Sequence, residues 1–115
     1  MLSKPPKNDS KYFWTAHVAR KMRQYRISEG LVRRIIRSPK RMEEGVAPDT
    51  VAVMQPAGHK RPYEVWVMYQ KKPKIIVISA WRYPGISPVR AAVPIPADVL
   101  AELRSMGCEP NQFRS

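Results

Sequence analysis

The spacing of apolar residues changes near Lys40 and Arg41, and this change limits what each half of the chain can form. Before that point apolar residues recur every three or four positions, whereas after it they alternate or run together over short segments. The first spacing places apolar side chains on one stripe of a helix, and alternation places them on one face of a strand. The chain is therefore expected to form helices first and strands second.

Two helices are expected in the first half, from about Ala16 to Tyr25 and from about Glu29 to Arg37. Thr15 and Ser28 precede them, and their hydroxyl oxygens can accept hydrogen bonds from the backbone of the first helical turn. Each helix carries apolar residues on one side and basic residues on the other. Residues 12–14 form an aromatic segment that is either a strand fragment or a lead-in that packs on the core.

The second half predicts strands over 51–54, 63–69 and 75–82, with turns at 55–62 and 70–74. The last of these strands is apolar on both faces, so it should lie centrally in the sheet and be covered on both sides. The links between the strands are short, and short links favour an antiparallel meander.

A third helix is expected from about Ala97 to Met106. The chain then divides into a flexible arm over 1–11, a domain over 12–83, and a proline-rich extension with the C-terminal helix over 84–115. Three helices and three or four strands predict an α+β domain in which helices pack on one sheet.

The charge of the chain favours a polyanionic partner. Its 115 residues include 21 Lys or Arg and 9 Asp or Glu, which gives a formal net charge of +12. A small domain stays soluble with much less charge, and the excess increases repulsion within the compact state. RNA, DNA or an acidic protein is therefore the first hypothesis for a partner, ahead of an anionic membrane surface.

The sequence also predicts a cytoplasmic protein without metal or cofactor. Cys108 is the single cysteine, which excludes an internal disulfide and a cysteine zinc site and suits a reducing compartment. The first nine residues lack the apolar segment of a signal peptide, and no apolar run approaches the length that spans a membrane. Two separated histidines predict no metal site, and no cofactor-binding motif is present.

The first expected helix carries His17, Arg20 and Lys21 at positions i, i+3 and i+4, so that the three side chains share one patch, called here the helix patch. Chemistry on a phosphodiester could use this set, because imidazole moves a proton near neutral pH and Arg or Lys stabilises developing negative charge. The alternative is a solvated helix face whose histidine is incidental.

Glu64 is the sole acidic residue between positions 51 and 95. It is expected to act as a general base, or else to form an ion pair with Arg82. Arg82 and Tyr83 end the expected central strand, where they contact either a phosphate and a stacked base or only the rim of the next turn. Trp66 and Trp81 are expected in the core.

Further basic residues on the second helix and in two turns are candidates for phosphate contacts. They are Arg33, Arg34, Arg37, Lys60, Arg61, Lys71 and Lys72. With the helix patch, they place the expected contact face on residues 17–41 and 60–83.

Several short motifs resemble a family of domains of unknown function. The run from Thr15 to Met22 resembles the family's opening T-x-H-A-x-x-R-M. The pieces that follow are similar to its R-x-I-S turn, valine-bearing helix and S-P stop, namely Tyr25-Arg26-Ile27-Ser28-Glu29, Val32 and Ser38-Pro39. That family is placed with the RelE/ParE-like toxin superfamily, and the similarity covers about residues 12–83.

The resemblance implies two N-terminal helices packed on a small curved antiparallel sheet. It also implies a ribonuclease toxin of a toxin–antitoxin type, whose relatives act on messenger RNA, some of them on the ribosome, and are neutralised by an antitoxin. His17 matches the family's histidine, and Lys21 takes the position of its arginine. Arg82 and Tyr83 are analogues of a basic–aromatic pair at the end of the sheet.

Three hypotheses follow for the function. The first is a metal-independent endoribonuclease in which the ribose 2′-OH attacks the adjacent phosphate, His17 or Glu64 assists proton transfer, and Tyr83 stacks on a base or donates a proton. In it, Arg20, Lys21 and Arg82 stabilise the developing charge. The second is a non-catalytic protein that binds RNA, the ribosome or DNA through the same basic face, with DNA ranked after RNA. The third is a protein that binds an acidic partner, such as an antitoxin, without nucleic acid.

Overall fold

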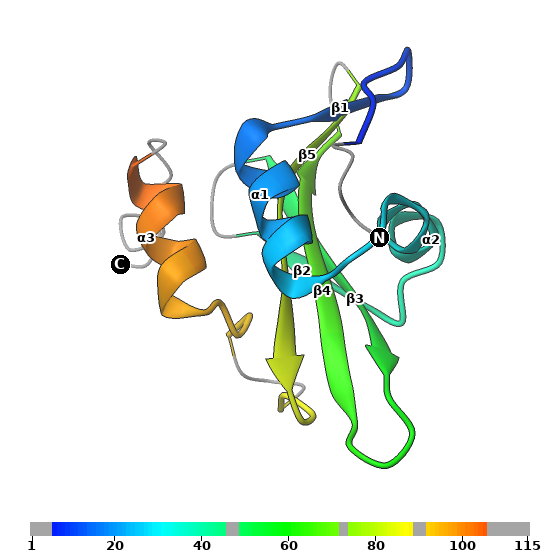
Figure 1. Ribbon diagram of the computed structural model, residues 1–115, viewed down its shortest axis with the longest axis vertical. Coiled ribbons are helices and arrows are strands. Elements are labelled where there is room, and N and C mark those ends of the chain that lie inside the picture. Colours follow the sequence, from blue (N-terminus) through cyan, green and yellow to red (C-terminus); the bar gives the residue numbers. More distant parts are fainter. Residues whose placement is uncertain (1–5, 46–48, 72–73, 89–91, 106–115) are drawn as a thin grey trace.

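The computed structural model describes residues 6–45, 49–71, 74–88 and 92–105, which form an α+β fold (Figure 1). The elements follow in the order β1 (Tyr12–Trp14), α1 (Ala16–Tyr25), α2 (Glu29–Arg37), β2 (Arg41–Glu44), β3 (Thr50–Ala57), β4 (Tyr63–Gln70), β5 (Ile75–Pro84) and α3 (Ala97–Ser105). The five strands make one sheet in the order β1-β5-β4-β3-β2.

The first two helices begin and end where the sequence predicts. The hydroxyl of Thr15 accepts a hydrogen bond from the backbone N–H of Val18 at 3.1 Å, and the hydroxyl of Ser28 accepts one from Leu31 at 3.2 Å. These bonds satisfy backbone donors that have no partner within the helix. The third helix begins at Ala97 as predicted, and Met106 lies outside the described residues.

The sheet differs from the predicted antiparallel meander in two strands. Residues 12–14 are a strand, β1, and they pair in parallel with β5. The strand β2 is missing from the sequence prediction because Arg41–Glu44 carries three charged residues, and its apolar Met42 is itself exposed at the sheet edge. The pairings of β3 with β4 and of β4 with β5 are antiparallel as predicted, and the unpredicted β2 also pairs antiparallel with β3.

The strand β3 continues to Ala57, into a segment that the sequence predicts as a turn. Its partner β2 reaches only as far as Met54, so Pro56 lies on a free edge of the sheet. Proline has no backbone N–H to donate and is tolerated at such an edge.

The sheet separates two apolar clusters, and α2 and α3 lie on opposite sides of it (Figure 1). The cluster on the α1–α2 side includes Tyr12, Trp14, Val18, Met22, Val32, Ile35, Val65 and Val67. The cluster on the α3 side includes Met54, Trp66, Met68, Ile78, Trp81, Val99 and Leu103. The prediction that β5 is covered on both faces is confirmed, because its residues contribute to both clusters. Its predicted central position is not, because β4 is the middle strand and β1 pairs only with Ile75–Val77 of β5. The core position of Trp66 and Trp81, each 0% exposed, is confirmed.

A β-bulge in β5 changes which side chains meet. Ser79 pairs with Met68 and Val77 pairs with Tyr69, so Ile78 has no opposite residue. Ile78 therefore joins the cluster on the α3 side, although strict alternation would place it on the other face.

Candidate nucleic-acid interface

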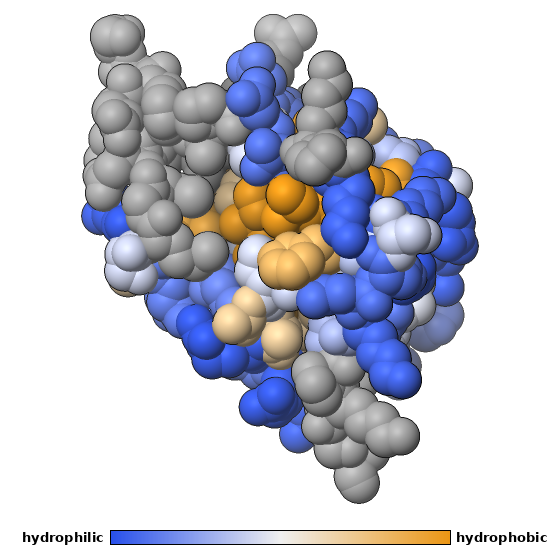
Figure 2. All heavy atoms as spheres, turned by 90° about the horizontal axis from the view of Figure 1, so that it is seen from above, coloured by the Kyte–Doolittle hydropathy of each residue, from blue (hydrophilic) through white to orange (hydrophobic). Residues whose placement is uncertain are grey.

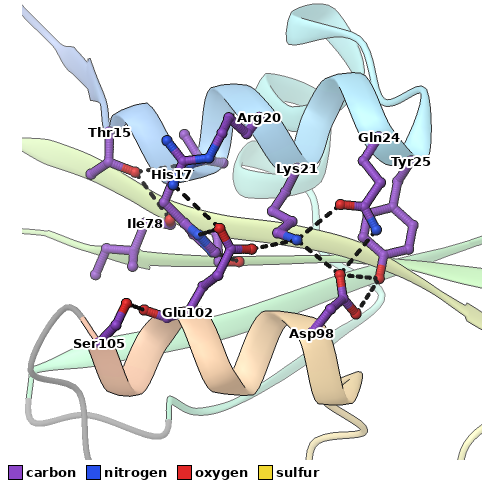
Figure 3. A network of polar contacts seen from close by, with 12 residues as sticks. Thr15, His17, Arg20, Lys21, Gln24, Tyr25, Ile78, Asp98, Glu102 and Ser105 are labelled. Carbon is purple, nitrogen blue, oxygen red and sulfur yellow. Dashed lines mark hydrogen bonds and ion pairs between the residues drawn. The ribbon is translucent and has the colours of Figure 1, made fainter.

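The helix patch faces α3 and is covered by it, which corrects the prediction of an open basic front (Figure 3). The side chain of Lys21 is buried, at 6% exposure, and its Nζ lies 2.8 Å from Oδ2 of Asp98 and 2.9 Å from Oε1 of Gln24. Lys21 also forms an ion pair with Glu102. Nη2 of Arg20 lies 3.3 Å from Oε2 of Glu102. Two carboxylates of α3 thus neutralise two of the cations that were expected to contact phosphate.

His17 lies inside the same contact and is 2% exposed. Its Nε2 lies 2.8 Å from Oγ of Ser79 on β5, and its Nδ1 lies 3.7 Å from Oε2 of Glu102. Burial lowers the pKa of His17 below its usual value, and the nearby Glu102 carboxylate only partly opposes this effect. The imidazole is therefore neutral at pH 7 and has no direct contact with solvent while α3 is docked.

The carboxylates of this network are ionised at neutral pH. Burial by itself raises the pKa of Asp98, but hydrogen bonds from Lys21, Gln24 and Tyr25 outweigh it and bring the pKa to about 2. A hydrogen bond from Lys21 lowers the pKa of Glu102. For Lys21, burial lowers the pKa, but the hydrogen bonds to Asp98 and Glu102 raise it overall. The contact between α1 and α3 is therefore held by full charges.

Glu64 anchors the segment that follows β5. It is 2% exposed, and its Oε1 accepts hydrogen bonds from Nε1 of Trp66 at 3.0 Å and from Oγ of Ser87 at 2.6 Å. Its Oε2 accepts one from the backbone N–H of Ser87 at 3.0 Å, and Nη1 of Arg41 donates to Oγ of Ser87 at 2.8 Å. The predicted ion pair with Arg82 is wrong, because Arg82 lies opposite Val65 on the other face of the sheet.

Arg82 and Tyr83 point to opposite faces of the sheet, because neighbouring side chains of a strand alternate. Nη2 of Arg82 donates to the backbone carbonyl of Arg26 at 3.1 Å, and its guanidinium carbon lies 5.0 Å from the ring centre of Tyr63. Tyr83 packs against the cluster on the α3 side. The two residues therefore do not form one basic–aromatic site.

Arg33 is engaged within the protein. It forms ion pairs with Asp9 at 3.1 Å and with Glu29 at 2.8 Å, and its guanidinium carbon lies 4.3 Å from the ring centre of Tyr12. Asp9 also accepts a hydrogen bond from the backbone N–H of Tyr12 at 2.7 Å, so this part of the expected N-terminal arm contacts β1. Of the predicted second-helix cations, Arg34 and Arg37 remain exposed.

The predicted turn cations lie at two different ends of the sheet. Lys60 and Arg61 precede β4 and Lys71 follows it, so the two groups are separated by about 26 Å, the length of eight strand residues at roughly 3.3 Å each. Lys72 lies outside the described residues. The expected single contact face is therefore divided.

One end of the sheet gathers the exposed cations. At the end that carries the β3–β4 turn, Arg82 donates a hydrogen bond to the carbonyl of Arg26, the residue that caps the end of α1. At the same end, Nε2 of Gln55 donates to the carbonyl of Ser38, which follows α2, at 2.6 Å. We call this end the basic end; it comprises Arg23, Arg26, Arg37, Lys40, Lys60 and Arg61, around Tyr63 and Arg82. Within the described ranges, the side chains of the first six form no ion pair or hydrogen bond.

The opposite end of the sheet has a different character. Seen from above in Figure 2, apolar side chains gather at its centre with hydrophilic ones around them. Phe13 of β1, which is partly exposed, belongs to this end, and the β2–β3 connection brings Glu44 and Asp49 there. Lys11, Lys71 and Lys74 lie at this end as well, so its charge is mixed. A polyanion is therefore attracted more strongly to the basic end, whose exposed cations have no carboxylates beside them among the described residues.

Comparisons of the chain with protein-family models, with curated proteins and with solved structures find no match. The resemblance to the RelE/ParE-like toxins therefore stays a prediction. In the part of the chain that the structure describes, His, Cys, Asp and Glu side chains form no group of three that could hold a metal ion. No helix among those residues is long and apolar enough to cross a membrane.

Proposed function

We propose that this protein binds RNA through the basic end of its sheet, as a non-catalytic binding protein. The observation that carries the proposal is the gathering of six exposed cations, without acidic partners among the described residues, at the ends of α1 and α2 and in the β3–β4 turn. Such a cluster neutralises phosphates and releases their counterions, which supplies most of the affinity of proteins for nucleic acid. The preference for RNA over DNA comes from the resemblance to the toxin superfamily.

The positions of the residues proposed for catalysis favour binding over cleavage. A general acid or base must lie within hydrogen-bond reach of the proton that it transfers. His17 and Glu64 are both buried, and their polar atoms contact α3, β5 and the segment after β5. Arg82 and Tyr83 lie on opposite faces of the sheet. These four residues therefore do not converge on one reacting phosphate.

The test is the affinity for a fluorescein-labelled single-stranded RNA of 20 nucleotides, measured by fluorescence anisotropy over a range of salt concentrations. If four cations contact phosphates, the logarithm of the association constant falls with the logarithm of salt with a slope of about −2.8, at roughly 0.7 per contact. The double variant R37Q/R61Q should lose about half of this slope. The matched control K71Q/R104Q removes the same charge from exposed positions outside the basic end and should keep it.

Equal losses in the two double variants would contradict the assignment of the basic end, and absence of binding would contradict the proposal itself. RNA integrity is followed on gels in the presence of EDTA. Cleavage that disappears in the His17→Ala variant would overturn the non-catalytic proposal in favour of a metal-independent nuclease.

A further inference from the structure

The underside of α3 complements the surface on which it lies. Asp98 and Glu102 stand one helical turn apart and reach Lys21 of α1, and Glu102 also reaches Arg20 (Figure 3). Val99 and Leu103, each one residue further along, are fully buried against the cluster on the α3 side. One stripe of α3 therefore carries negative charge, and the neighbouring stripe is apolar.

The groups under α3 are mostly hydrogen-bond donors. Lys21 and Arg20 are cations without acceptor atoms, and Nε1 of Trp81 is buried without a hydrogen-bond partner in the described structure. When the hydroxyl of Ser79 donates to Nε2 of His17, the imidazole carries its hydrogen on Nδ1 and points it toward Glu102. This set is an anion-binding surface, and its present anions are carboxylates of the same chain.

The covered surface is continuous with the basic end. The side chain of Arg20 is 57% exposed at the margin of the contact. Arg23 follows one helical turn later, and Arg26 follows at the end of α1. A polyanion bound at the basic end that extends along α1 therefore meets α3 next.

The electrostatic part of the α3 contact is of a kind that another anion can replace. The side chains of Asp98 and Glu102 are 43% and 32% exposed, so water and salt reach the carboxylate side of each pair, whereas the side chain of Lys21 is 6% exposed. The pair of Arg20 with Glu102 is exposed on both sides and contributes little. Lys21 is buried and needs an anionic partner, and a phosphate offers it one equivalent to a carboxylate. The apolar part, Val99 and Leu103, keeps α3 in place when no competing anion is bound.

We propose that His17, Arg20 and Lys21 form a second phosphate-contact surface for RNA, which α3 occupies in cis with its own carboxylates. RNA bound at the basic end reaches this surface when α3 undocks, and α3 thereby lowers the affinity of the free protein. This inference rests on the proposed RNA binding. It assigns to α3 the role of an internal competitor, in addition to its role in covering the sheet.

The experiment removes the two carboxylates and keeps the rest of α3. In the variant D98N/E102Q, docking loses the three ion pairs that Lys21 and Arg20 make with these carboxylates. We expect RNA affinity at low salt to rise about fivefold, as for the loss of three pairs of modest strength. The salt slope should steepen by about 1.4, which corresponds to two further contacts with a single strand. Adding Lys21→Gln and Arg20→Gln to this variant should abolish the gain.

The matched control is E44Q/D49N, which raises the net charge by the same amount. Glu44 and Asp49 lie by the β2–β3 connection, away from α3, and form no ion pair in the part of the chain described. If D98N/E102Q gains no more affinity than this control, the gain is a general charge effect and the inference fails. If the wild type shows no salt-dependent RNA binding at all, it is the proposed function that fails.

Hydrogen exchange of the backbone amides in α3 gives an independent measurement that also works if D98N/E102Q is too unstable to assay. Saturating RNA should speed exchange over residues 97–105 of the wild type while it slows exchange at the end of α1. Unchanged or slower exchange in α3 would overturn the inference. A second result would also overturn the inference. If D98N/E102Q bound a peptide of residues 96–105 more tightly than the wild type does, but bound RNA no more tightly, the surface under α3 would select an acidic amphipathic helix and not RNA.

Discussion

The buried carboxylate of Glu64 offers the sharpest test of how this fold is held together. Its Oε1 accepts two hydrogen bonds, from Trp66 and from the hydroxyl of Ser87, and its Oε2 accepts one from the backbone of Ser87. In Glu64→Gln, the amide oxygen can keep the first two bonds, but the amide NH₂ then faces the N–H of Ser87. One bond is lost and two donors oppose each other, so we expect a loss of about 1–3 kcal/mol in the free energy of unfolding.

Glu64→Ala removes all three bonds and leaves buried donors on Trp66 and Ser87 without partners. Hydrogen bonds to a charged group contribute about 1.5–3 kcal/mol each, but the desolvation of the carboxylate is regained, so the expected net loss is about 3 kcal/mol. Ser87→Ala, which removes one of these bonds and one from Arg41, should cost about 1–2 kcal/mol.

The assay is equilibrium unfolding in urea, followed by tryptophan fluorescence, since Trp66 contacts the mutated carboxylate. Domains of this kind have about 5–15 kcal/mol of stability, so the three variants should rank clearly. A Glu64→Ala protein within about 0.5 kcal/mol of wild type would refute the anchoring argument. If that variant also lost an RNA-cleaving activity without losing stability, Glu64 would act as the general base predicted from the sequence.

Other predictions follow from the polar contact of α3 and from two glycines. The pKa of Asp98 is about 2, below its usual 3.8, so its ionised form stabilises the docking of α3 above pH 3.8, and this contribution is lost as the pH falls toward 2. Hydrogen exchange of α3 should therefore become faster over this pH range in the wild type, and Asp98→Asn should remove this pH dependence. Burial lowers the pKa of His17 below 6.5, so the folded state favours the neutral imidazole, and the free energy of unfolding should decline as the pH falls below 6.5. Urea unfolding between pH 7 and 5 should show this decline in the wild type but not in His17→Gln. Gly58 has a φ of +86°, and an added Cβ would lie 2.3 Å from the carbonyl oxygen of Arg61, so Gly58→Ala should lower the midpoint of thermal unfolding. Gly30→Ala in α2 meets nothing within 4 Å and should stabilise by about 0.5–1 kcal/mol.

Local signals predicted the helices well because the interactions that define them are local. Thr15 and Ser28 cap helices whose first and last residues agree with the structure. The strands β4 and β5 were found from their β-branched and aromatic residues, although their ends extend by one or two positions. Arg41–Glu44 was missed because a charged edge strand carries no such pattern, and only its pairing with β3 makes it a strand.

The candidate site was predicted less well because it depends on which distant segments meet. The spacing of His17, Arg20 and Lys21 correctly placed them on one helix face, but no local rule says what lies opposite that face. One signal was available: Asp98 and Glu102 stand at i, i+4 in a chain with few carboxylates, and this spacing matches a row of cations on another helix. Those two carboxylates lie in α3, to which the sequence analysis assigned no functional role, so they were not matched to the cations of α1.

The sequence alone determined the α+β class, the two capped helices, the apolar strand β5 and the +12 charge, because each of these depends on composition or on residues close to one another in the chain. The tertiary structure alone decided that β1 lies parallel to β5, that a bulge turns Ile78 and Ser79 to one face, and that α3 lies on the helix patch. The pairing of β1 with β5 and the contact of α3 with α1 join residues about 60 to 80 positions apart, and the bulge depends on the pairing of β5 with β4. Their free energy comes from shared burial and charge pairing that no single segment contains. The charge predicted a polyanionic partner, but the packing of α3 decided which cations are left to meet it.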